Sequence, residues 1–384
     1  MKIKKICFLA GIYPTEQRPK AAVFYQNLVN EMAKKGIDCR VIYPFAINKS
    51  KDYYNLKKQY LINEDYSVTI YRPKTITLGA RKLGLWNTAY ITACLYTQSA
   101  KKLLKKINWK PDIFYGHFIS PAGIMAAKLS NETGIPAFVA YGESRPWSIN
   151  TIGVKRTQKK MNSISGFISV STKNKNDLIN LGIATGDKIK VFPNGINCKV
   201  FYKRNKIEAR KKMGWDLDKF IVAFVGHYNR RKGILRLDEA VKKLPDVYVA
   251  YAGDGELKPT SNNIIHQGNV SPNKMALFLS AADIFVLPTL NEGCCNAIIE
   301  AMACGLPIIS SDRLFNYDIL SKDNAILIDP TSISDIRNAI INIKDNKKLR
   351  KDLATRSMEV ACNLTIERRV ENILNWMEYR INNN

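Results

Sequence analysis

The feature that most constrains the fold is a repeated alternation between short apolar runs, rich in Ile, Val and Phe, and longer amphipathic stretches. This alternation is typical of βαβ units, in which helices cover both faces of a parallel sheet. Strands are expected near residues 3–10, 38–44, 67–71, 112–116, 137–140, 166–170, 188–192, 220–226, 246–252, 263–267, 283–287, 307–310 and 325–328. Helices are expected near residues 22–35, 82–107, 121–132, 173–181, 232–243, 272–280, 293–304 and 333–343, and from about 347 to the end. We therefore predict an α/β protein with parallel sheets.

The alternation is interrupted once, near the middle of the chain. A polar, basic stretch from Asn197 to about Lys206 follows the turn Pro193-Asn-Gly195, and the βα pattern then restarts. Because 384 residues suit two domains of ordinary size, we place the linker there. We predict one Rossmann-like domain over residues 1–198, a second over 199–364, and a C-terminal helix over 365–384 that packs back on the first domain.

Neither a membrane span nor a secretory signal is predicted. No apolar run approaches the roughly 18 residues that a membrane-spanning helix needs. The basic start is followed by an apolar run that ends at Pro14 without a cleavage site, so we interpret it as a buried strand. The eight cysteines form no Cys-x-x-Cys pair, which argues against a zinc site and a disulfide framework. We expect a cytoplasmic protein whose cysteines are small buried thiols.

The net charge is the outlier of the composition. The chain carries 59 Lys and Arg against 33 Asp and Glu, a formal +26. Residues 1–198 hold 31 basic and 11 acidic side chains, a formal +20, so most of the excess lies in the first half. Such an excess indicates an anionic partner. We expect the N-terminal domain to dock on an anionic membrane surface, peripherally at the inner face of the cell membrane.

The basic residues concentrate in a few pairs: Lys57-Lys58, Lys101-Lys102, Lys105-Lys106, Lys155-Arg156 and Lys159-Lys160. The segment from Arg81 to Lys106 adds apolar side chains, namely Leu83, Leu85, Trp86, Tyr90 and Leu95. A basic helix with such residues can lie at a lipid interface. The alternative is that these apolar residues face the domain core and the lysines are solvated.

The most informative stretch follows the predicted strand at 283–287. A short loop containing Glu292 leads into a helix that starts with small residues, and the free N–H groups of such a helix start can hold a phosphate. Glu300 follows eight residues later, roughly 12 Å along a helix axis. Both glutamates could be surface residues of an amphipathic helix. However, the helix is apolar nearly all round, and a buried carboxylate at Glu300 is costly unless a polar ligand satisfies it.

This stretch, which continues Glu300-Ala-Met-Ala-Cys-Gly-Leu-Pro307, resembles the Glu-x7-Glu motif of glycosyltransferase family 4. The resemblance covers nearly the whole chain and implies the GT-B fold, two facing Rossmann-like domains with a central cleft and a C-terminal helical segment. It implies a nucleotide-diphosphate sugar as donor, with Glu292 contacting the donor sugar and Glu300 the ribose. The backbone amides expected to hold sugar and phosphate are those of Gly293, Cys294, Cys295, Asn296 and Ala297.

A second patch spans Gly226 to Gly233 and again combines a strand end, a loop and a helix start. Family members usually carry Gly-Arg followed by Lys-Gly, and the two basic side chains grip the leaving diphosphate. Lys232 matches the lysine, but His227 occupies the usual arginine position. Because a neutral imidazole is a weaker phosphate clamp than a guanidinium, our hypothesis is that Arg231 supplies the clamp. The alternative is that the basic residues form a solvated turn.

Two further groups of residues resemble family sites. His117 ends the predicted strand at 112–116 and resembles the N-domain histidine that touches the donor sugar near the reacting carbon, although a lone histidine is more often structural. The turns that resemble the nucleoside-binding loops contain Gly253, Asp254, Gly268 and Val270, although Gly-Asp-Gly is also an ordinary turn.

The sequence departs from the family pattern at two places in the first half. The phosphate-facing glycine of the first loop is replaced by Ala21 or Ala22. The usual His-Gly after the strand at 137–140 is Tyr141-Gly142. Both departures leave backbone contacts possible and bear on how the sugar and the acceptor are held.

The resemblance implies transfer of a hexose-type sugar, with retention of configuration, to a glycan or lipid-linked glycan acceptor in surface polysaccharide or glycolipid synthesis. Glu292, His117, Arg231 and Lys232 are the predicted catalytic residues, with the two cations stabilising charge on the leaving diphosphate. An Asp-x-Asp pair can hold a divalent ion between the donor phosphates, but Asp216-Leu-Asp218 lies in the linker region and precedes a strand. We therefore expect no metal and no cofactor. The alternatives are an epimerase or a phosphorylase of the same fold, and a nucleic-acid-binding protein, which lacks support from any recognition motif.

Overall fold

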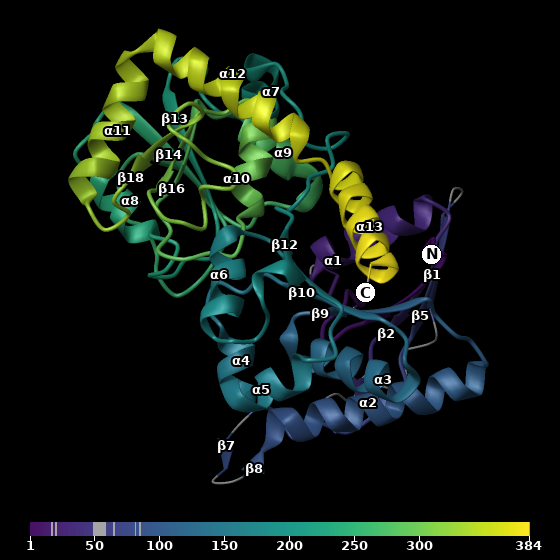
Figure 1. Cartoon of the computed structure of the whole chain (residues 1–384). Helices are drawn as coiled ribbons and strands as arrows, with labels where there is room; N and C mark the ends of the chain where they lie inside the picture. The colour runs from purple at the N-terminus through teal and green to yellow at the C-terminus, as the bar shows by residue number, and fades with distance from the viewer. Residues whose placement is uncertain are drawn as a thin grey trace. The chain divides into compact units, whose positions relative to one another are not determined.

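The computed structural model of the protein describes residues 1–16, 18–19, 21–48, 59–63, 66–80, 82–83 and 86–383. The chain divides into two compact units. Unit 1 comprises Met1–Phe192 and Arg369–Asn384, and unit 2 comprises Pro193–Arg368. Each unit is a largely parallel sheet covered by helices (Figure 1), so the predicted α/β fold class is confirmed.

Unit 1 is built on an eight-stranded sheet with the order β12-β11-β10-β9-β1-β2-β5-β4. All neighbouring strands are parallel except β4 and β5, which are antiparallel. The central strands are buried on both faces, as their apolar runs predict. The strands are β1 (Lys5–Leu9), β2 (Asp38–Ile42), β4 (Gln59–Asn63), β5 (Tyr66–Tyr71), β9 (Ile113–His117), β10 (Ala137–Tyr141), β11 (Gly166–Ser169) and β12 (Ile189–Val191). Shorter strands are β3 (Phe45–Ala46), β6 (Lys74–Thr75), β7 (Lys82–Leu83) and β8 (Trp86–Asn87).

Helices cover both faces of this sheet, with α2, α3 and α5 on one face and α1 and α13 on the other (Figure 1). The helix α13 belongs to unit 1 because Trp376 packs edge-on against Phe138 and Phe192, and Arg380 Nε donates to the Ser165 carbonyl at 3.1 Å. The helices are α1 (Val23–Lys34), α2 (Thr88–Ile107), the π-helical turn η2 (Ile119–Gly123), α3 (Ile124–Thr133), α4 (Trp147–Ile152), α5 (Val154–Met161), α6 (Thr172–Asn180), the short turn η3 (Gly186–Lys188) and α13 (Ile366–Asn382).

Unit 2 is built on a six-stranded parallel sheet with the order β15-β14-β13-β16-β17-β18. Helices α8 and α11 cover one face, and α7, α9, α10 and α12 cover the other (Figure 1). The strands are β13 (Phe220–Val225), β14 (Val247–Ala252), β15 (Ile264–Gly268), β16 (Ile284–Leu287), β17 (Ile308–Ser311) and β18 (Ala325–Ile328). The helices are α7 (Lys206–Met213), α8 (Ile234–Val241), α9 (Pro272–Ser280), α10 (Asn296–Ala303), α11 (Ile333–Asp345) and α12 (Lys347–Asn363).

Several helix boundaries differ from the expectation. The helix expected from residue 82 begins at Thr88, because the Asn87 side chain caps it by accepting from the Tyr90 N–H at 2.9 Å, and the short pair β7–β8 precedes it. The expected linker ends where α7 begins, and this helix was not predicted because its composition is so basic. Its Arg210 is buried and pairs with Asp283 at 2.6 Å. Helices α4 and α5 were also missed.

Several of the apolar side chains in the segment 81–106, which was expected at a membrane surface, pack instead against the core of unit 1. Tyr90 packs against the core of unit 1, as do Leu103 and Leu104, and Leu95 is half-buried. Lys57, Lys58, Arg81 and Leu85 lie outside the described residues, as do the side chains of Leu83 and Trp86. Tyr90, Leu103 and Leu104 of α2 therefore face the protein. No helix among the described residues is long and apolar enough to cross a bilayer.

Candidate active site

The candidate site of unit 2 forms where two adjacent strands end. Strands β13 and β16 are parallel neighbours, so the loops that follow them meet at the same edge of the sheet. The loop after β13 carries Arg231 and Lys232, and the loop after β16 carries Glu292. A backbone hydrogen bond from the Leu290 N–H to the Arg231 carbonyl, 2.8 Å long, ties the two loops together.

These loops place Glu292 between the two basic residues. Its Oε1 lies 2.6 Å from Arg231 Nη1 and 2.7 Å from Lys232 Nζ. The Thr289 hydroxyl donates to the same oxygen at 2.9 Å, and Arg231 Nη1 also donates to the Asn291 carbonyl at 2.7 Å. The Glu292 side chain is only 12% exposed, so its charge depends on these partners. Two cations and one carboxylate leave a net positive cluster, which suits an anionic ligand.

Lys232 is as enclosed as Glu292, with a side chain that is also 12% exposed. Its Nζ lies 3.8 Å from Cys295 Sγ, and its stem passes close to Gly226, where an added Cβ would come within 3.3 Å of Lys232 Cδ. Burial alone would lower the pKa of Lys232, but the neighbouring Cys295 and the Glu292 carboxylate outweigh burial and raise the pKa. Lys232 is therefore a fixed positive charge at neutral pH.

Glu300 lies on α10, among side chains that are fully buried: Ile298, Ile299, Ala301 and Met302. Among the described residues, no hydrogen bond or ion pair reaches its carboxylate. Burial raises its pKa to about 7. The helix begins only at Asn296, so the estimate of roughly 12 Å to Glu292, which assumed one continuous helix, does not apply. Glu300 is half-buried rather than fully buried, and its carboxylate has no hydrogen-bond or ion-pair partner among the described residues.

The residues expected to offer backbone amides form the start of α10. Cys295 takes the N-cap position without a side-chain cap, Gly293 is buried in the preceding loop, and Asn296 and Ala297 open the helix. Asn194, which sequence analysis noted only as part of a turn, binds this loop: its Nδ2 donates to the Cys294 carbonyl at 3.2 Å and to Asn296 Oδ1 at 2.8 Å. The helix start is thus held in place by a residue from the beginning of unit 2.

His227 does not join the charge cluster. Its side chain is 58% exposed, and Nδ1 lies 3.6 Å from Asp254 Oδ1. Asp254 accepts a hydrogen bond from Asn269 Nδ2 at 2.6 Å, and this bond, aided by His227, lowers the pKa of Asp254. The structure therefore brings His227 to the predicted nucleoside loops, while Arg231 joins Glu292 and Lys232.

The two predicted nucleoside-binding loops, around Gly253 and Gly268, are joined by tight backbone contacts. Gly253 has a φ of 142°, and an added Cβ would lie 2.0 Å from the Gly226 carbonyl oxygen, so only glycine fits. Its N–H donates to the Gly268 carbonyl at 2.9 Å, and the Gly268 N–H donates to the Tyr228 hydroxyl at 3.2 Å. Val270 follows, partly buried. Tyr228, which no sequence signal identified, therefore links the two loops.

His117 belongs to unit 1, where it ends β9 as expected. Its ring stacks on Tyr25 with centroids 4.2 Å apart and meets Phe118 edge-on at 4.7 Å. Burial, with a smaller contribution from the Arg369 charge, lowers its pKa to about 3, so the imidazole is neutral. Its Nδ1 is buried without a hydrogen-bond partner among the described residues. A neutral ring with an unpaired nitrogen is suited to a hydrogen bond with a polar ligand.

The structure also shows the surroundings of the two positions in the first half that depart from the family pattern. Ala22 is the N-cap that precedes α1 and has a left-handed φ of 53°, the conformation in which glycine is favoured. Tyr141 is fully buried at the end of β10, and its hydroxyl has no partner among the described residues.

The described residues contain no group of three or more His, Cys, Asp or Glu that could hold a metal ion, and the cysteines are unpaired.

Comparisons with known proteins bear on the family and the fold of the chain. The family model for Glycosyltransferase Family 4 matches residues 21–200, and that for Glycosyl transferases group 1 matches residues 205–360. A putative teichuronic acid biosynthesis glycosyltransferase, TuaC of Bacillus subtilis, is 29% identical over 369 residues, covering 91% of this chain and 92% of TuaC. The UDP-Gal:alpha-D-GlcNAc-diphosphoundecaprenol alpha-1,3-galactosyltransferase of Escherichia coli is 28% identical, over 65% of this chain and 70% of its own.

A solved structure has the same fold over nearly the whole chain. The HepE protein of Anabaena, in complex with UDP and glucose, superimposes with a TM-score of 0.71 and 16% sequence identity, covering 98% of this chain and 100% of HepE. The two family models lie end to end and together leave only short segments of the chain unmatched. With its two parallel α/β sheets and C-terminal helices, the chain belongs to glycosyltransferase family 4 and has the GT-B fold.

Proposed function

We propose that the protein transfers a hexose-type sugar, with retention of configuration and without a metal ion, from a nucleoside-diphosphate sugar to a glycan or lipid-linked glycan. The observation that carries this proposal is the pairing of Glu292 with Arg231 and Lys232 at the carboxyl edge of the unit 2 sheet. A net positive, largely buried cluster at the start of a helix is suited to a diphosphate. Retention is the usual outcome in this family.

The cluster would act mainly by electrostatic stabilisation. When the bond between the anomeric carbon and the diphosphate oxygen breaks, its electron pair goes to that oxygen and negative charge grows there. Lys232, Arg231 and the start of α10 stabilise this charge. The acceptor hydroxyl then attacks the anomeric carbon from the face that the diphosphate left, and its proton passes to the leaving phosphate. Glu292 orients the two cations and contacts the donor sugar.

The nucleoside half of the donor would occupy the remaining groups of unit 2. Glu300 lacks a partner among the described residues, and two ribose hydroxyls would supply the hydrogen bonds that its carboxylate lacks. The loops around Gly253 and Gly268 offer backbone groups at the same edge of the sheet. The HepE complex contains UDP, which supports a uridine nucleotide as the first donor to test.

Metal independence is proposed because the protein supplies cations of its own. Lys232 and Arg231 are both fixed in place by Glu292, and the raised pKa of Lys232 keeps it charged. Two such groups can neutralise a leaving diphosphate, a role that a divalent ion fills in other transferases. Activity that survives a chelator would agree with this proposal, and activity restored only by a divalent ion would contradict it.

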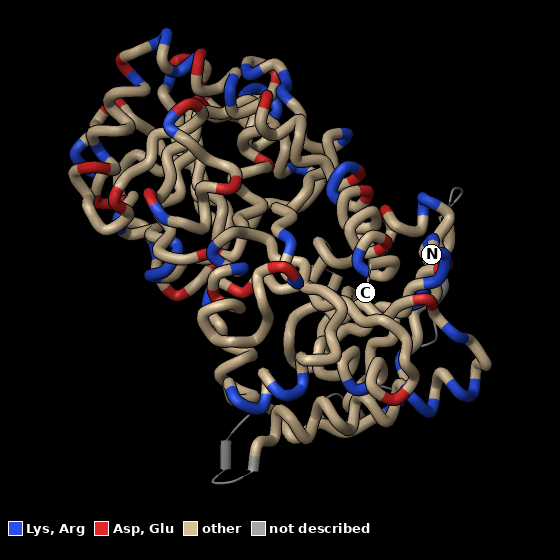
Figure 2. The backbone as a smooth tube through the Cα atoms, viewed as in Figure 1, with Lys and Arg blue, Asp and Glu red and all other residues tan. Residues whose placement is uncertain are grey.

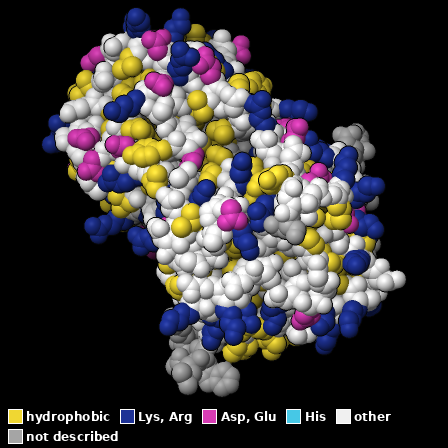
Figure 3. All heavy atoms as spheres, in the orientation of Figure 1, with side chains coloured by type: hydrophobic (Ala, Val, Ile, Leu, Met, Phe, Trp, Pro, Cys, Tyr) yellow, Lys and Arg dark blue, Asp and Glu magenta, His cyan; other side chains and the backbone are white. Residues whose placement is uncertain are grey.

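The acceptor is proposed to be presented at the cytoplasmic face of an anionic membrane, to which unit 1 docks. Figure 2 shows that Lys and Arg positions recur along α2 and α5 of unit 1, and Figure 3 shows Lys and Arg side chains gathered on the surface at that edge. Exposed members are Lys102, Lys105, Lys106, Lys155, Arg156 and Lys159. Each contributes roughly 1 kcal/mol near an anionic leaflet. TuaC is named for teichuronic acid biosynthesis, and the Escherichia coli relative for a diphosphoundecaprenol-linked substrate, which supports a surface-glycan pathway and a lipid-linked acceptor.

The donor half of this proposal can be tested by thermal shift with a panel of nucleoside diphosphates and nucleotide sugars. We expect at least one nucleoside diphosphate to stabilise the protein, and the shift to be lost in Lys232→Ala and Glu300→Ala. Lys243→Ala is the matched control, because Lys243 is an exposed lysine of the same unit. No shift with any nucleotide, or equal shifts in all variants, would contradict the proposed donor site.

A further inference from the structure

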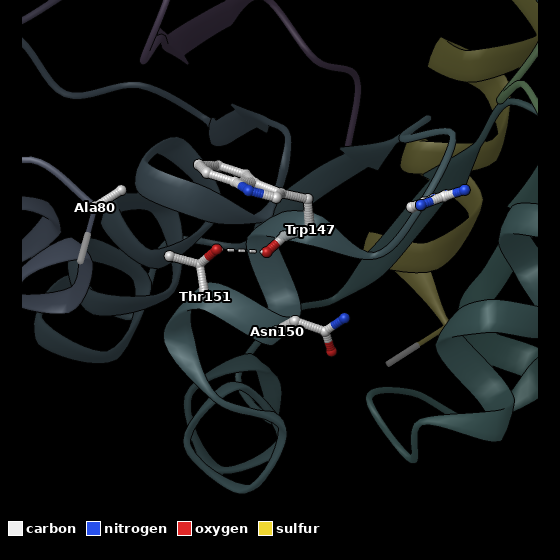
Figure 4. Close-up of a pocket in the computed structure, with 5 residues that line it drawn as sticks. Ala80, Trp147, Asn150 and Thr151 are labelled. Atoms are coloured by element: carbon white, nitrogen blue, oxygen red, sulfur yellow. Dashed lines mark hydrogen bonds between the residues drawn. The ribbon is translucent and has the colours of Figure 1, made fainter. Parts of the chain in front are cut away.

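A hollow in unit 1, with a volume of about 370 Å³, is lined by Ala80, Arg145, Trp147, Asn150 and Thr151 (Figure 4). Trp147 is 62% exposed, which is unusual for so large an apolar side chain. In the part of the chain that the structure describes, no hydrogen bond, ion pair or ring contact engages the side chains of Arg145, Trp147 or Asn150. Three side chains with different binding capacities thus line one hollow without internal partners.

The segment that carries these side chains is firmly held by the residues beneath it. Ser148 is fully buried, and its N–H donates to Glu143 Oε2 at 3.0 Å. The Asn87 amide donates to the Thr151 carbonyl at 2.7 Å. The Thr151 hydroxyl in turn donates to the Trp147 carbonyl at 2.7 Å (Figure 4). Because this backbone is already ordered, binding at the exposed indole costs little further conformational entropy.

The chemistry of the lining fits a saccharide with a negative charge. An exposed indole face stacks on the C–H bonds of a pyranose ring, and an amide pairs with its hydroxyls. The planar guanidinium of Arg145 binds a carboxylate or a phosphate through two hydrogen bonds. A tryptophan that inserts into lipid would have apolar neighbours, whereas the described residues that line the hollow beside Trp147 are one alanine and three polar side chains. We propose that this hollow binds a saccharide bearing a carboxylate or phosphate group.

The position of the hollow indicates that this saccharide is part of the acceptor, an inference that rests on the proposed function. The hollow follows β10 at the carboxyl edge of the sheet, where α/β proteins bind their ligands. In the adjacent strand, His117 pairs in register with Ala140 of β10. Helix α4 packs against η2, the turn that follows His117. The proposed saccharide site and His117 therefore share one edge of the unit 1 sheet.

Calorimetric titration of the full chain tests the proposal without donor or turnover. Three probes are compared: a neutral hexose disaccharide, the same disaccharide with one hexose oxidised to a hexuronic acid, and a hexose phosphate. We expect the acidic probes to bind more tightly than the neutral one. Trp147→Ala should weaken their binding about tenfold or more, Trp147→Phe should retain most of it, and Arg145→Gln should remove the preference for acidic probes. Comparing hexuronate with phosphate identifies which anion is preferred.

Tyr379→Ala is the matched control, because Tyr379 is an equally exposed aromatic residue of unit 1, on α13. Its saccharide binding should equal that of the wild type. The proposal is overturned if Trp147→Ala binds the probes as the wild type does, if no probe binds, or if Trp147→Ala loses binding to anionic vesicles instead. Saccharide binding through Trp147 together with no sugar transfer from any donor would keep the saccharide site and reject its role as an acceptor site.

Discussion

Substituting Glu300 by Gln should stabilise the protein while weakening its donor site. The carboxyl is half-buried in α10, and burial raises its pKa from 4.5 to about 7. Below a pH of about 4.5 the group is protonated in both the folded and the unfolded state, so it costs no stability. As the pH rises to about 7, the unfolded chain ionises first, and the folded state loses stability relative to it. The full difference corresponds to about 3 kcal/mol.

Glutamine stays neutral and avoids this cost. We therefore expect Glu300→Gln to raise the free energy of unfolding by up to about 3 kcal/mol at about pH 8, and by much less at about pH 5. Urea denaturation at the two pH values measures the difference. Glu359→Gln is the control, because Glu359 is an exposed glutamate of the same unit, paired with Arg356, and such surface pairs contribute little.

The affinity for the donor should fall in Glu300→Gln, although the free energy of unfolding rises. If ribose hydroxyls donate to an ionised Glu300, the affinity of the wild type for UDP should rise about tenfold between about pH 6 and about pH 8, because the ionised fraction rises by that factor around a pKa of about 7. Glu300→Gln should bind more weakly at pH 8 and should lose this part of the pH dependence. A variant that is no more stable at pH 8, or that keeps the wild-type pH profile of UDP binding, would refute the reasoning.

Four further outcomes are expected. Lys232→Ala should lower turnover by about 10²–10³-fold, as for loss of one electrostatic donor in a transition state, while Lys243→Ala leaves turnover unchanged; equal rates would remove Lys232 from the mechanism. Arg231→Ala should lower turnover more than His227→Ala, because Arg231 binds Glu292 whereas His227 is exposed; the reverse order would make His227 the phosphate clamp. Ala22→Gly should raise the free energy of unfolding by up to about 1 kcal/mol, measured in urea, by relieving a left-handed alanine; a loss of stability would show that the methyl group packs usefully. The protein should co-float with liposomes of acidic lipids at low salt and not with neutral ones, whereas equal flotation with both would contradict electrostatic docking.

Much of the architecture could be predicted because it depends on local patterns. Except for the edge strand β4, which was missed, the apolar runs predicted the strands of both sheets to within a few residues, since strands buried on both faces must be continuously apolar. The helix α7 could not be predicted in this way. Its sequence reads as a solvated basic segment, and only the tertiary pairing of Arg210 with Asp283 shows why the helix packs.

In the candidate site, too, local sequence patterns identified some features, whereas those that depend on tertiary contacts could not be predicted. The motif pointed to Glu292 and Glu300, and the apolar surroundings of Glu300 predicted a buried carboxylate, which the structure shows to be half-buried. The sequence does not show that Thr289 donates to Glu292, because that contact depends on where β16 ends. Nor does it show that Trp147 is exposed, since a tryptophan at the start of an amphipathic helix is ordinarily part of a core.

The most direct test of the account is a transfer reaction followed by NMR in the presence of a chelator. The purified protein is incubated with a nucleotide sugar that thermal shift has identified and with candidate glycan and lipid-linked acceptors. The account predicts release of the nucleoside diphosphate, a product with the anomeric configuration of the donor, and loss of both in Lys232→Ala. A product of inverted configuration, activity only with a divalent ion, or isomerisation of the donor without transfer would contradict it.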